Sequence, residues 1–196
     1  MESDIEQVLW TAADIEQRVK ELAAAISRDL ASHTPLLLLG VATGAFMLVA
    51  DLARHLKLPV LVDFIRVQSY GNNTQSSGVA TVSSCDAKIN VKGKHILLVE
   101  DIIDTGVTLS ALVDHLLERG AASISVCALL DKVCRRRVGL TLPSNGRLYA
   151  GFQVRGGLRH GFRGALPKPP IRGSTQTASL PELQVRLTVH CGESQY

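Results

Sequence analysis

Residues 96–109, with the sequence ILLVEDIIDTGVTL, constrain the fold more than any other part of the chain. Their unbroken apolar start is typical of a strand buried on both faces of a parallel sheet. The apolar run ends in Glu100 and Asp101, a third carboxylate follows at Asp104, and Thr-Gly then leads into a segment with helical apolar spacing. We therefore predict a strand, an acidic turn and a helix, an arrangement that forms ligand sites in open α/β sheets.

This turn offers two kinds of ligand chemistry. The first free N–H groups of the helix, between Thr105 and Thr108, would bind an anion such as phosphate, because the helix dipole is positive there. Glu100 and Asp101 would accept ribose hydroxyls or hold Mg²⁺ through water. The alternative is structural: Asp104 caps the helix and the other acids are solvated, each contributing about 0.3–1 kcal/mol.

Composition limits the class of protein. A chain of 196 residues, 46% hydrophobic and without repeats or a long linker, is expected to form one domain around one sheet. The formal charge is +3 and the basic residues are scattered, apart from an arginine run at 135–137 that could hold a phosphate or a partner subunit. This pattern gives little support for nucleic-acid or membrane binding.

The N-terminus, the apolar runs and the cysteine spacing all bear on the cellular location of the protein. The N-terminus has no basic-then-apolar leader, and the longest apolar run is too short to span a bilayer. The cysteines have no C-x-x-C spacing, which suits free thiols in a reducing compartment. We therefore expect a cytoplasmic protein.

Apolar periodicity and turn residues predict the remaining elements. A capped amphipathic helix is expected over 11–32 and a helix over about 105–119, with Gly120 at its end. Core strands are expected over 35–41, 59–67, 122–130 and 148–152, and segments 79–83 and 90–95 would form a hairpin.

VEDIIDTG at 99–106, together with LLDK at 129–132, resembles the phosphoribosyl-pyrophosphate (PRPP) signature of the purine phosphoribosyltransferases. The pair of motifs looks like the hypoxanthine(-guanine) phosphoribosyltransferase family, and the resemblance covers about residues 5–153. It implies the type I phosphoribosyltransferase fold, an α/β fold with a central, mostly parallel sheet flanked by helices and a small hood. It also implies Mg²⁺-dependent purine salvage by a homodimer or homotetramer, in which hypoxanthine or guanine and PRPP give IMP or GMP and pyrophosphate. The sequence does not choose between hypoxanthine, guanine and xanthine.

The resemblance assigns roles around the acidic turn. Glu100 and Asp101 would hold ribose hydroxyls and the metal. Asp104 would exchange a proton with the purine ring, as a general base or as a hydrogen-bonding stabiliser. The backbone and hydroxyls of five consecutive residues would hold the 5′-phosphate: Asp104, Thr105, Gly106, Val107 and Thr108.

Three further residues would bind the purine. By resemblance, Lys132 donates to the exocyclic oxygen of a 6-oxopurine, which excludes adenine, whereas a lysine at a strand end is usually a solvated cation. Tyr149 would stack on the base, with Ala150 backbone groups at its edge. The alternative for Tyr149 is a buried aromatic residue of a core strand.

Two loops complete the expected site. The turn at Thr43 and Gly44 would hold pyrophosphate through main-chain N–H groups and contain a cis peptide between these two residues, although an ordinary tight turn has the same small residues. Ser69 and Tyr70 begin a polar loop that resembles the family's mobile lid over bound PRPP. A surface linker would have the same composition.

The resemblance stops after Gln153. We therefore divide the chain into a transferase domain, residues 1–153, and a divergent tail, residues 154–196. The tail is expected to be mostly loop or disorder, with one strand at 183–189. Codons for residues 154–171 can be chosen so that a frame shifted by one nucleotide reads FVVGYGMDFAERYRNLPY, the family ending. We hypothesise a frameshifted tail and an incomplete hood.

This tail puts the activity of the chain in doubt, because the family's second-metal aspartate and pyrophosphate-binding arginine have no counterparts in it. The alternative is a non-catalytic PRPP- or nucleotide-binding regulator on the same fold. Lys132 and the Ser-Tyr-Gly start of the lid argue against a regulator, and Lys132 also disfavours an adenine transferase.

Overall fold

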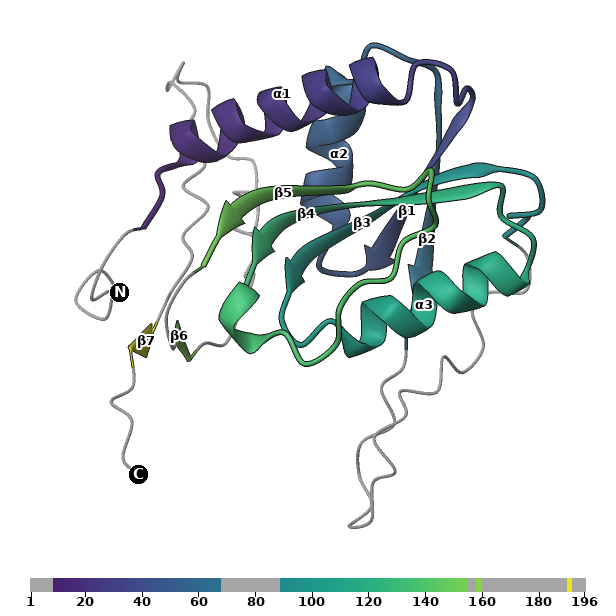
Figure 1. The fold of residues 1–196 in the computed structure, drawn as a ribbon. Helices are drawn as coiled ribbons and strands as arrows, with labels where there is room; N and C mark the ends of the chain where they lie inside the picture. The colour runs from purple at the N-terminus through teal and green to yellow at the C-terminus, as the bar shows by residue number, and fades with distance from the viewer. Residues whose placement is uncertain (1–8, 68–88, 155–157, 160–189, 192–196) are drawn as a thin grey trace, which may run out of the picture. The chain divides into compact units, whose positions relative to one another are not determined.

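The computed structural model describes residues 9–67, 89–154, 158–159 and 190–191. The chain divides into two units, residues 18–156 and residues 1–17 with 157–196. The larger unit contains a five-stranded sheet with the strand order β2-β1-β3-β4-β5 (Figure 1). The predicted boundary after Gln153 stays a prediction.

Every neighbouring pair of strands in this sheet is parallel, which confirms the expected fold class. The strands are β1 (Leu36–Ala42), β2 (Val60–Arg66), β3 (His95–Ile103), β4 (Ser123–Asp131) and β5 (Leu148–Gln153). Because parallel strands end at the same edge, the register brings Ile103 beside Asp131 and Asp131 beside Gln153. The polar residues that follow β1, β3 and β4 therefore share one edge of the sheet.

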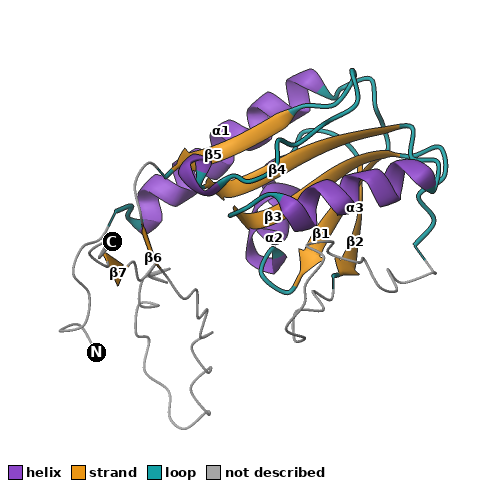
Figure 2. Cartoon of the chain, turned by 60° about the horizontal axis from the view of Figure 1, so that its bottom comes forward, coloured by secondary structure: helices purple, strands orange, loops and turns teal. Residues whose placement is uncertain are grey.

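Helices cover both faces of the sheet, with α1 (Ala12–Asp29) and α2 (Phe46–His55) on one side and α3 (Val107–Glu118) on the other (Figures 1 and 2). The three central strands β1, β3 and β4 are mostly buried, as an apolar run in a parallel sheet requires, whereas the edge strands β2 and β5 are more exposed. A Cβ built on Gly40 in β1 would lie 2.8 Å from Val49 Cγ2 of α2, so the glycine allows this close packing. Within the described ranges, no helix is long and apolar enough to cross a membrane.

The start of α1 confirms the predicted N-cap. Thr11 donates through its backbone N–H and its hydroxyl to Asp14 Oδ2, and the Asp14 N–H donates to Thr11 Oγ1. These hydrogen bonds favour the ionised carboxylate and lower the pKa of Asp14. Two otherwise unpaired donors at the helix start are thereby satisfied.

Three expectations about element bounds are corrected. Helix α1 ends at Asp29, not Ser32, and α3 begins at Val107, not Thr105, because Gly106 has a left-handed backbone with φ of 80°. Residues 90–94 form a turn instead of a hairpin strand, and the expected partner at 79–83 lies outside the described residues.

In the other unit, a short β6 (Leu158–Arg159) pairs antiparallel with β7 (His190–Cys191). The strand predicted at 183–189 and the rest of the tail lie outside the part of the chain that the structure describes.

Candidate active site

The turn between β3 and α3 lies at the centre of the carboxyl edge. Gly106 adopts φ of 80°, and a Cβ built on it would lie 2.9 Å from the Val138 carbonyl oxygen. Both observations require glycine, since an L side chain there would be strained and would clash. Helix α3 starts immediately afterwards, so its first N–H groups open onto this edge.

Two partly buried carboxylates precede the turn. The Asp101 N–H donates to Glu100 Oε1 at 3.3 Å, and the Ile102 N–H donates to Asp101 Oδ1 at 2.7 Å. Burial, together with the adjacent Asp101 carboxylate, raises the pKa of Glu100 to about 9. A cation placed beside this pair would offset both effects, which is the electrostatic requirement for a metal site.

The β1–α2 turn lies against Asp101. A Cβ built on Gly44 would come within 2.5 Å of Asp101 Oδ2, so only glycine permits this approach. Among the described residues, the N–H groups of Thr43 and Gly44 have no hydrogen-bond acceptor, whereas those of Ala45 and Phe46 donate within the turn. Two free donors beside a carboxylate pair suit an anion that carries a metal ion.

The same turn corrects one expectation. The cis peptide bond joins Ala42 to Thr43, one residue before the predicted bond between Thr43 and Gly44. It falls where β1 ends and the chain leaves the sheet, and the sequence does not mark that end to within one residue.

Lys132 and Asp104 meet at this edge, although 28 positions separate them in the chain. Lys132 follows β4 and is only 5% exposed, so it is not the solvated cation of the alternative interpretation. Its Nζ lies 3.5 Å from Asp104 Oδ1, and the Nε of Arg135 lies 2.9 Å from the same oxygen. A purine carbonyl and ring nitrogen presented here would meet a cation and a carboxylate together.

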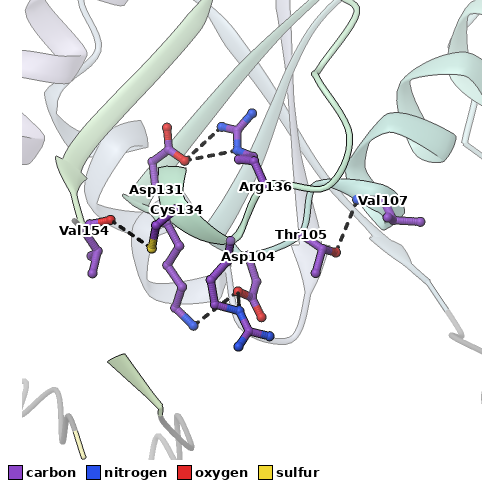
Figure 3. A network of polar contacts seen from close by, with 9 residues as sticks. Asp104, Thr105, Val107, Asp131, Cys134, Arg136 and Val154 are labelled. Atoms are coloured by element: carbon purple, nitrogen blue, oxygen red, sulfur yellow. Dashed lines mark hydrogen bonds and ion pairs between the residues drawn. The ribbon is translucent and has the colours of Figure 1, made fainter. Parts of the chain in front are cut away.

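Residues 133–138 pack on the β3–α3 turn (Figure 3). The short helix η1 (Val133–Arg135) begins this segment, and Arg136 donates through Nε and Nη2 to the buried Asp131 carboxylate at 3.2 and 2.9 Å. The N–H groups of Arg137 and Val138 donate to the Thr105 carbonyl at 2.9 and 3.3 Å. The arginine run is visible in the sequence, but its pairing with Asp104 and Asp131 at this edge is not.

The position of Tyr149 bears on its predicted role in base binding. It pairs in register with Cys127, well before the carboxyl end of β5, and is only 8% exposed. Its hydroxyl donates to Asp29 Oδ2 on α1 at 3.4 Å, so the ring lies in the layer between sheet and helix. This position favours the alternative interpretation, a buried aromatic residue of a core strand, and stacking of Tyr149 on a base stays a prediction.

The predicted role of Ala150 meets the same difficulty. Arg18 of α1 donates through Nη2 to the Ala150 carbonyl at 3.2 Å and through Nε to the Gly151 carbonyl at 2.6 Å. These carbonyl groups already accept hydrogen bonds from α1, and a contact between the Ala150 backbone and a base stays a prediction. The predicted lid residues Ser69 and Tyr70 lie outside the described ranges.

Comparison with known proteins identifies this arrangement. The family model "Phosphoribosyl transferase domain" matches residues 10–149. The hypoxanthine-guanine phosphoribosyltransferase of Bacillus subtilis is 40% identical over 154 residues, covering 79% of this chain and 82% of the relative. The hypoxanthine-guanine-xanthine phosphoribosyltransferase of Tritrichomonas foetus is 42% identical, covering 79% of this chain and 80% of the relative.

Solved structures agree with these relatives. A crystal structure of a hypoxanthine-guanine phosphoribosyltransferase from Bacillus anthracis, with a HEPES molecule in its active site, has a TM-score of 0.65 and 39% identity, covering 76% of this chain and 85% of that one. The hypoxanthine phosphoribosyltransferase of Trypanosoma cruzi, studied for the role of its C-terminal region in oligomeric state and activity, has a TM-score of 0.67 and 35% identity, covering 78% and 80%. The chain belongs to the phosphoribosyltransferase family and, within it, to the hypoxanthine-guanine phosphoribosyltransferases.

Proposed function

We propose that this chain transfers the phosphoribosyl group of PRPP to a 6-oxopurine, giving IMP from hypoxanthine or GMP from guanine, with release of pyrophosphate. The observation that carries the proposal is the buried Lys132 ammonium beside the Asp104 carboxylate at the carboxyl edge of the sheet. A non-catalytic regulator is not favoured, because the relatives are named as transferases and a sensor has no need of a buried base-specific cation.

PRPP would bind across the two turns. The N–H groups and hydroxyls of the β3–α3 turn would hold the 5′-phosphate, because the α3 dipole favours an anion there: Asp104, Thr105, Gly106, Val107 and Thr108. The free N–H groups of Thr43 and Gly44 would hold the pyrophosphate. Glu100 and Asp101 would bind the ribose hydroxyls.

Mg²⁺ fits the acid pair. Glu100 and Asp101 supply two adjacent carboxylates, and the raised pKa of Glu100 reflects buried negative charge that a cation would offset. No group of three or more possible metal ligands occurs among the residues described, which agrees with an ion that keeps waters and takes PRPP oxygens. When bound, Mg²⁺ would neutralise charge on the departing pyrophosphate.

Purine recognition would use Lys132, after β4, and Asp104, after β3, at the same edge of the sheet. Lys132 would donate to the exocyclic oxygen of hypoxanthine or guanine, and adenine, with an amino group in that place, would leave the ammonium without an acceptor. Such an unpaired buried donor costs about 1–3 kcal/mol. Asp104 would exchange a proton with the ring as the new bond to ribose forms.

Other proposals concern the remaining chain. Ser69 and Tyr70 would close over PRPP and exclude water from the reacting ribose. We further propose a transferase domain of residues 1–153 with a divergent tail of 154–196, assembly into a homodimer or homotetramer, and a cytoplasmic location.

Purified chain incubated with PRPP, Mg²⁺ and one purine at a time tests the main proposal. Chromatography should show IMP or GMP from hypoxanthine or guanine and no AMP from adenine, and a chelator should abolish the products. Xanthine in a parallel reaction defines the remaining specificity. Calorimetric PRPP binding without any nucleotide product would instead favour the regulator.

Replacing residues 154–171 by FVVGYGMDFAERYRNLPY tests the tail. If the tail is a frameshifted relic, this replacement raises transferase activity by orders of magnitude, because it restores the hood and its aspartate and arginine. Full activity from the chain as written would contradict that interpretation.

A further inference from the structure

Asp104 is shared by two cations through a single oxygen. The Nζ of Lys132 lies 3.5 Å from Oδ1, whereas the Nε of Arg135 lies 2.9 Å from it. Oδ2 contacts no polar side chain in the part of the chain that is described. The carboxylate thus has one oxygen held by cations and one oxygen left for a ligand.

The two cations lie at different distances from the Asp104 carboxylate. A separation of 3.5 Å is at the limit of a hydrogen bond, so the Lys132 ammonium interacts only weakly with Asp104. Arg135 makes the closer ion pair. Because Coulomb attraction grows as the distance between charges falls, Arg135 makes the stronger ion pair with Asp104, and Lys132 keeps only the long hydrogen bond.

The backbone around Arg135 is anchored on both sides. Its own N–H donates to the Lys132 carbonyl at 2.9 Å. The next residue, Arg136, is fixed by two hydrogen bonds to Asp131, and Arg137 donates its N–H to Thr105. The side chain of Arg135 is 46% exposed, but hydrogen bonds on both sides fix the backbone that carries it.

We propose that Arg135 is a positioning residue for the transferase reaction. It holds Asp104 through Oδ1, which leaves Oδ2 to the purine ring and keeps the Lys132 ammonium free for the exocyclic oxygen. This inference rests on the proposed function. Without Arg135, Asp104 would rotate more freely and would draw Lys132 toward itself, so purine binding and the chemical step would both suffer while PRPP binding would not.

Arg135→Ala in the full chain is the direct test, with steady-state kinetics for each substrate. We expect kcat to fall about tenfold, between the roughly 2–5-fold effect of an exposed ion pair and the ~100-fold effect of misplacing a group by about 1 Å. The KM for hypoxanthine should rise, the KM for PRPP should stay within about twofold, and Arg135→Lys should recover part of the loss, because it restores a cation.

Two controls separate positioning from general charge and from folding. Arg137→Ala removes the same charge from the same segment, and its guanidinium contacts no side chain among the residues described, so it reports the bulk electrostatic effect. Arg54→Ala removes another exposed arginine paired with an aspartate, Asp51, away from the site, and should leave kcat unchanged. The melting temperature of each variant should lie within about 1 °C of the parent, because losing an exposed ion pair costs little stability.

The results for Arg135→Ala and the parent chain test the role of Arg135 separately from the proposed transferase function. If the parent chain forms IMP and Arg135→Ala matches it, or loses no more than Arg137→Ala, the inference is overturned and the function stands. If the parent chain binds IMP in calorimetry without turnover, Arg135→Ala should bind IMP several-fold more weakly, and unchanged affinity overturns the inference. A parent chain that neither forms nor binds IMP overturns the proposed function and the inference with it.

Discussion

Two aspartates in this protein each pair with two cations, but they lie in different parts of the fold. Asp104 joins Lys132 and Arg135 at the carboxyl edge of the sheet, and its side chain is 41% exposed. Asp29, at the end of α1, accepts from Arg28 through Oδ1 at 3.1 Å, and from Arg147 at 3.1 Å and the Tyr149 hydroxyl at 3.4 Å through Oδ2. Its side chain is 15% exposed. The two clusters use similar chemistry in different places.

The comparison shows that the position of an aspartate relative to the strand ends indicates whether it can meet a ligand. Asp104 lies beyond β3, where helix starts, loops and strand ends leave room for a ligand. Asp29 lies between a helix and β5, where its contacts fasten one layer to the next. Charged groups of the same type therefore point to function at the edge and to stability within the layers.

Asp104→Asn should give the largest effect and should separate the two aspartates most clearly. Proton transfer by a positioned side chain contributes about 10²–10⁴-fold, so kcat should fall by at least 10², whereas PRPP affinity should change little because backbone donors hold the phosphate. Kinetics and PRPP calorimetry measure the two quantities. Asp29→Asn, the matched control, should lower the melting temperature and leave kcat near that of the parent. Equal losses of kcat and PRPP affinity in Asp104→Asn would refute the assignment.

Lys132→Ala should give the next largest effect. Removing the donor to a buried purine oxygen costs about 1–3 kcal/mol, or roughly 5–150-fold in kcat/KM for hypoxanthine. PRPP binding should persist, since Asp104 keeps Arg135 as its ion-pair partner. Arg147→Ala removes a cation from the Asp29 cluster and should leave purine use intact. Undiminished hypoxanthine activity in Lys132→Ala would reduce this lysine to a structural role.

Tyr149→Phe tests whether the Asp29 cluster is structural. Losing one long hydrogen bond should lower the free energy of unfolding by about 0.5–1.5 kcal/mol, measured by urea denaturation. The KM for hypoxanthine should not change, because the ring lies between β5 and α1. A raised purine KM at unchanged stability would return Tyr149 to the base-binding site.

The smallest effect should be an alkaline pH dependence of stability. Burial, and then the nearby Asp29 carboxylate, raises the pKa of Tyr149 from 10.0 to about 12. Between these values the folded chain holds a proton that the unfolded chain has lost, so this contribution to stability is complete below pH 10 and declines as the pH rises toward 12. The melting temperature of Tyr149→Phe should therefore decline less than that of the parent between pH 10 and 11.5. Parallel curves for the two proteins would show that the phenol does not titrate differently on folding.

Much of the fold was predictable because its signals are local. The apolar run before Glu100, the glycine after Thr105 and the capping residues at Thr11 and Asp14 each specify backbone conformation within a few residues. The role of Lys132 was expected from the resemblance, and its burial agrees with that role. The lid residues Ser69 and Tyr70 stay predictions.

The rest depended on partners that sequence spacing does not reveal. Tyr149 sits on a predicted strand, but its depth along that strand follows from the register with β4, and its contact with Asp29 follows from the packing of α1. Arg135 and Arg136 stood out as a basic run, and only the folded chain pairs them with Asp104 and Asp131.

The sequence by itself determined the order of strands and helices, the acidic turn at 100–104 and the family, because hydrophobic period, glycine positions and motif letters act along the chain. Tertiary structure decided which charges meet. Parallel pairing in the order β2-β1-β3-β4-β5 brings the ends of β3 and β4 side by side, so Asp104 and Lys132 become neighbours across 28 positions of sequence. Ion pairs depend on distances of a few ångströms between side chains, and those distances follow from strand register and helix packing, which no local pattern encodes.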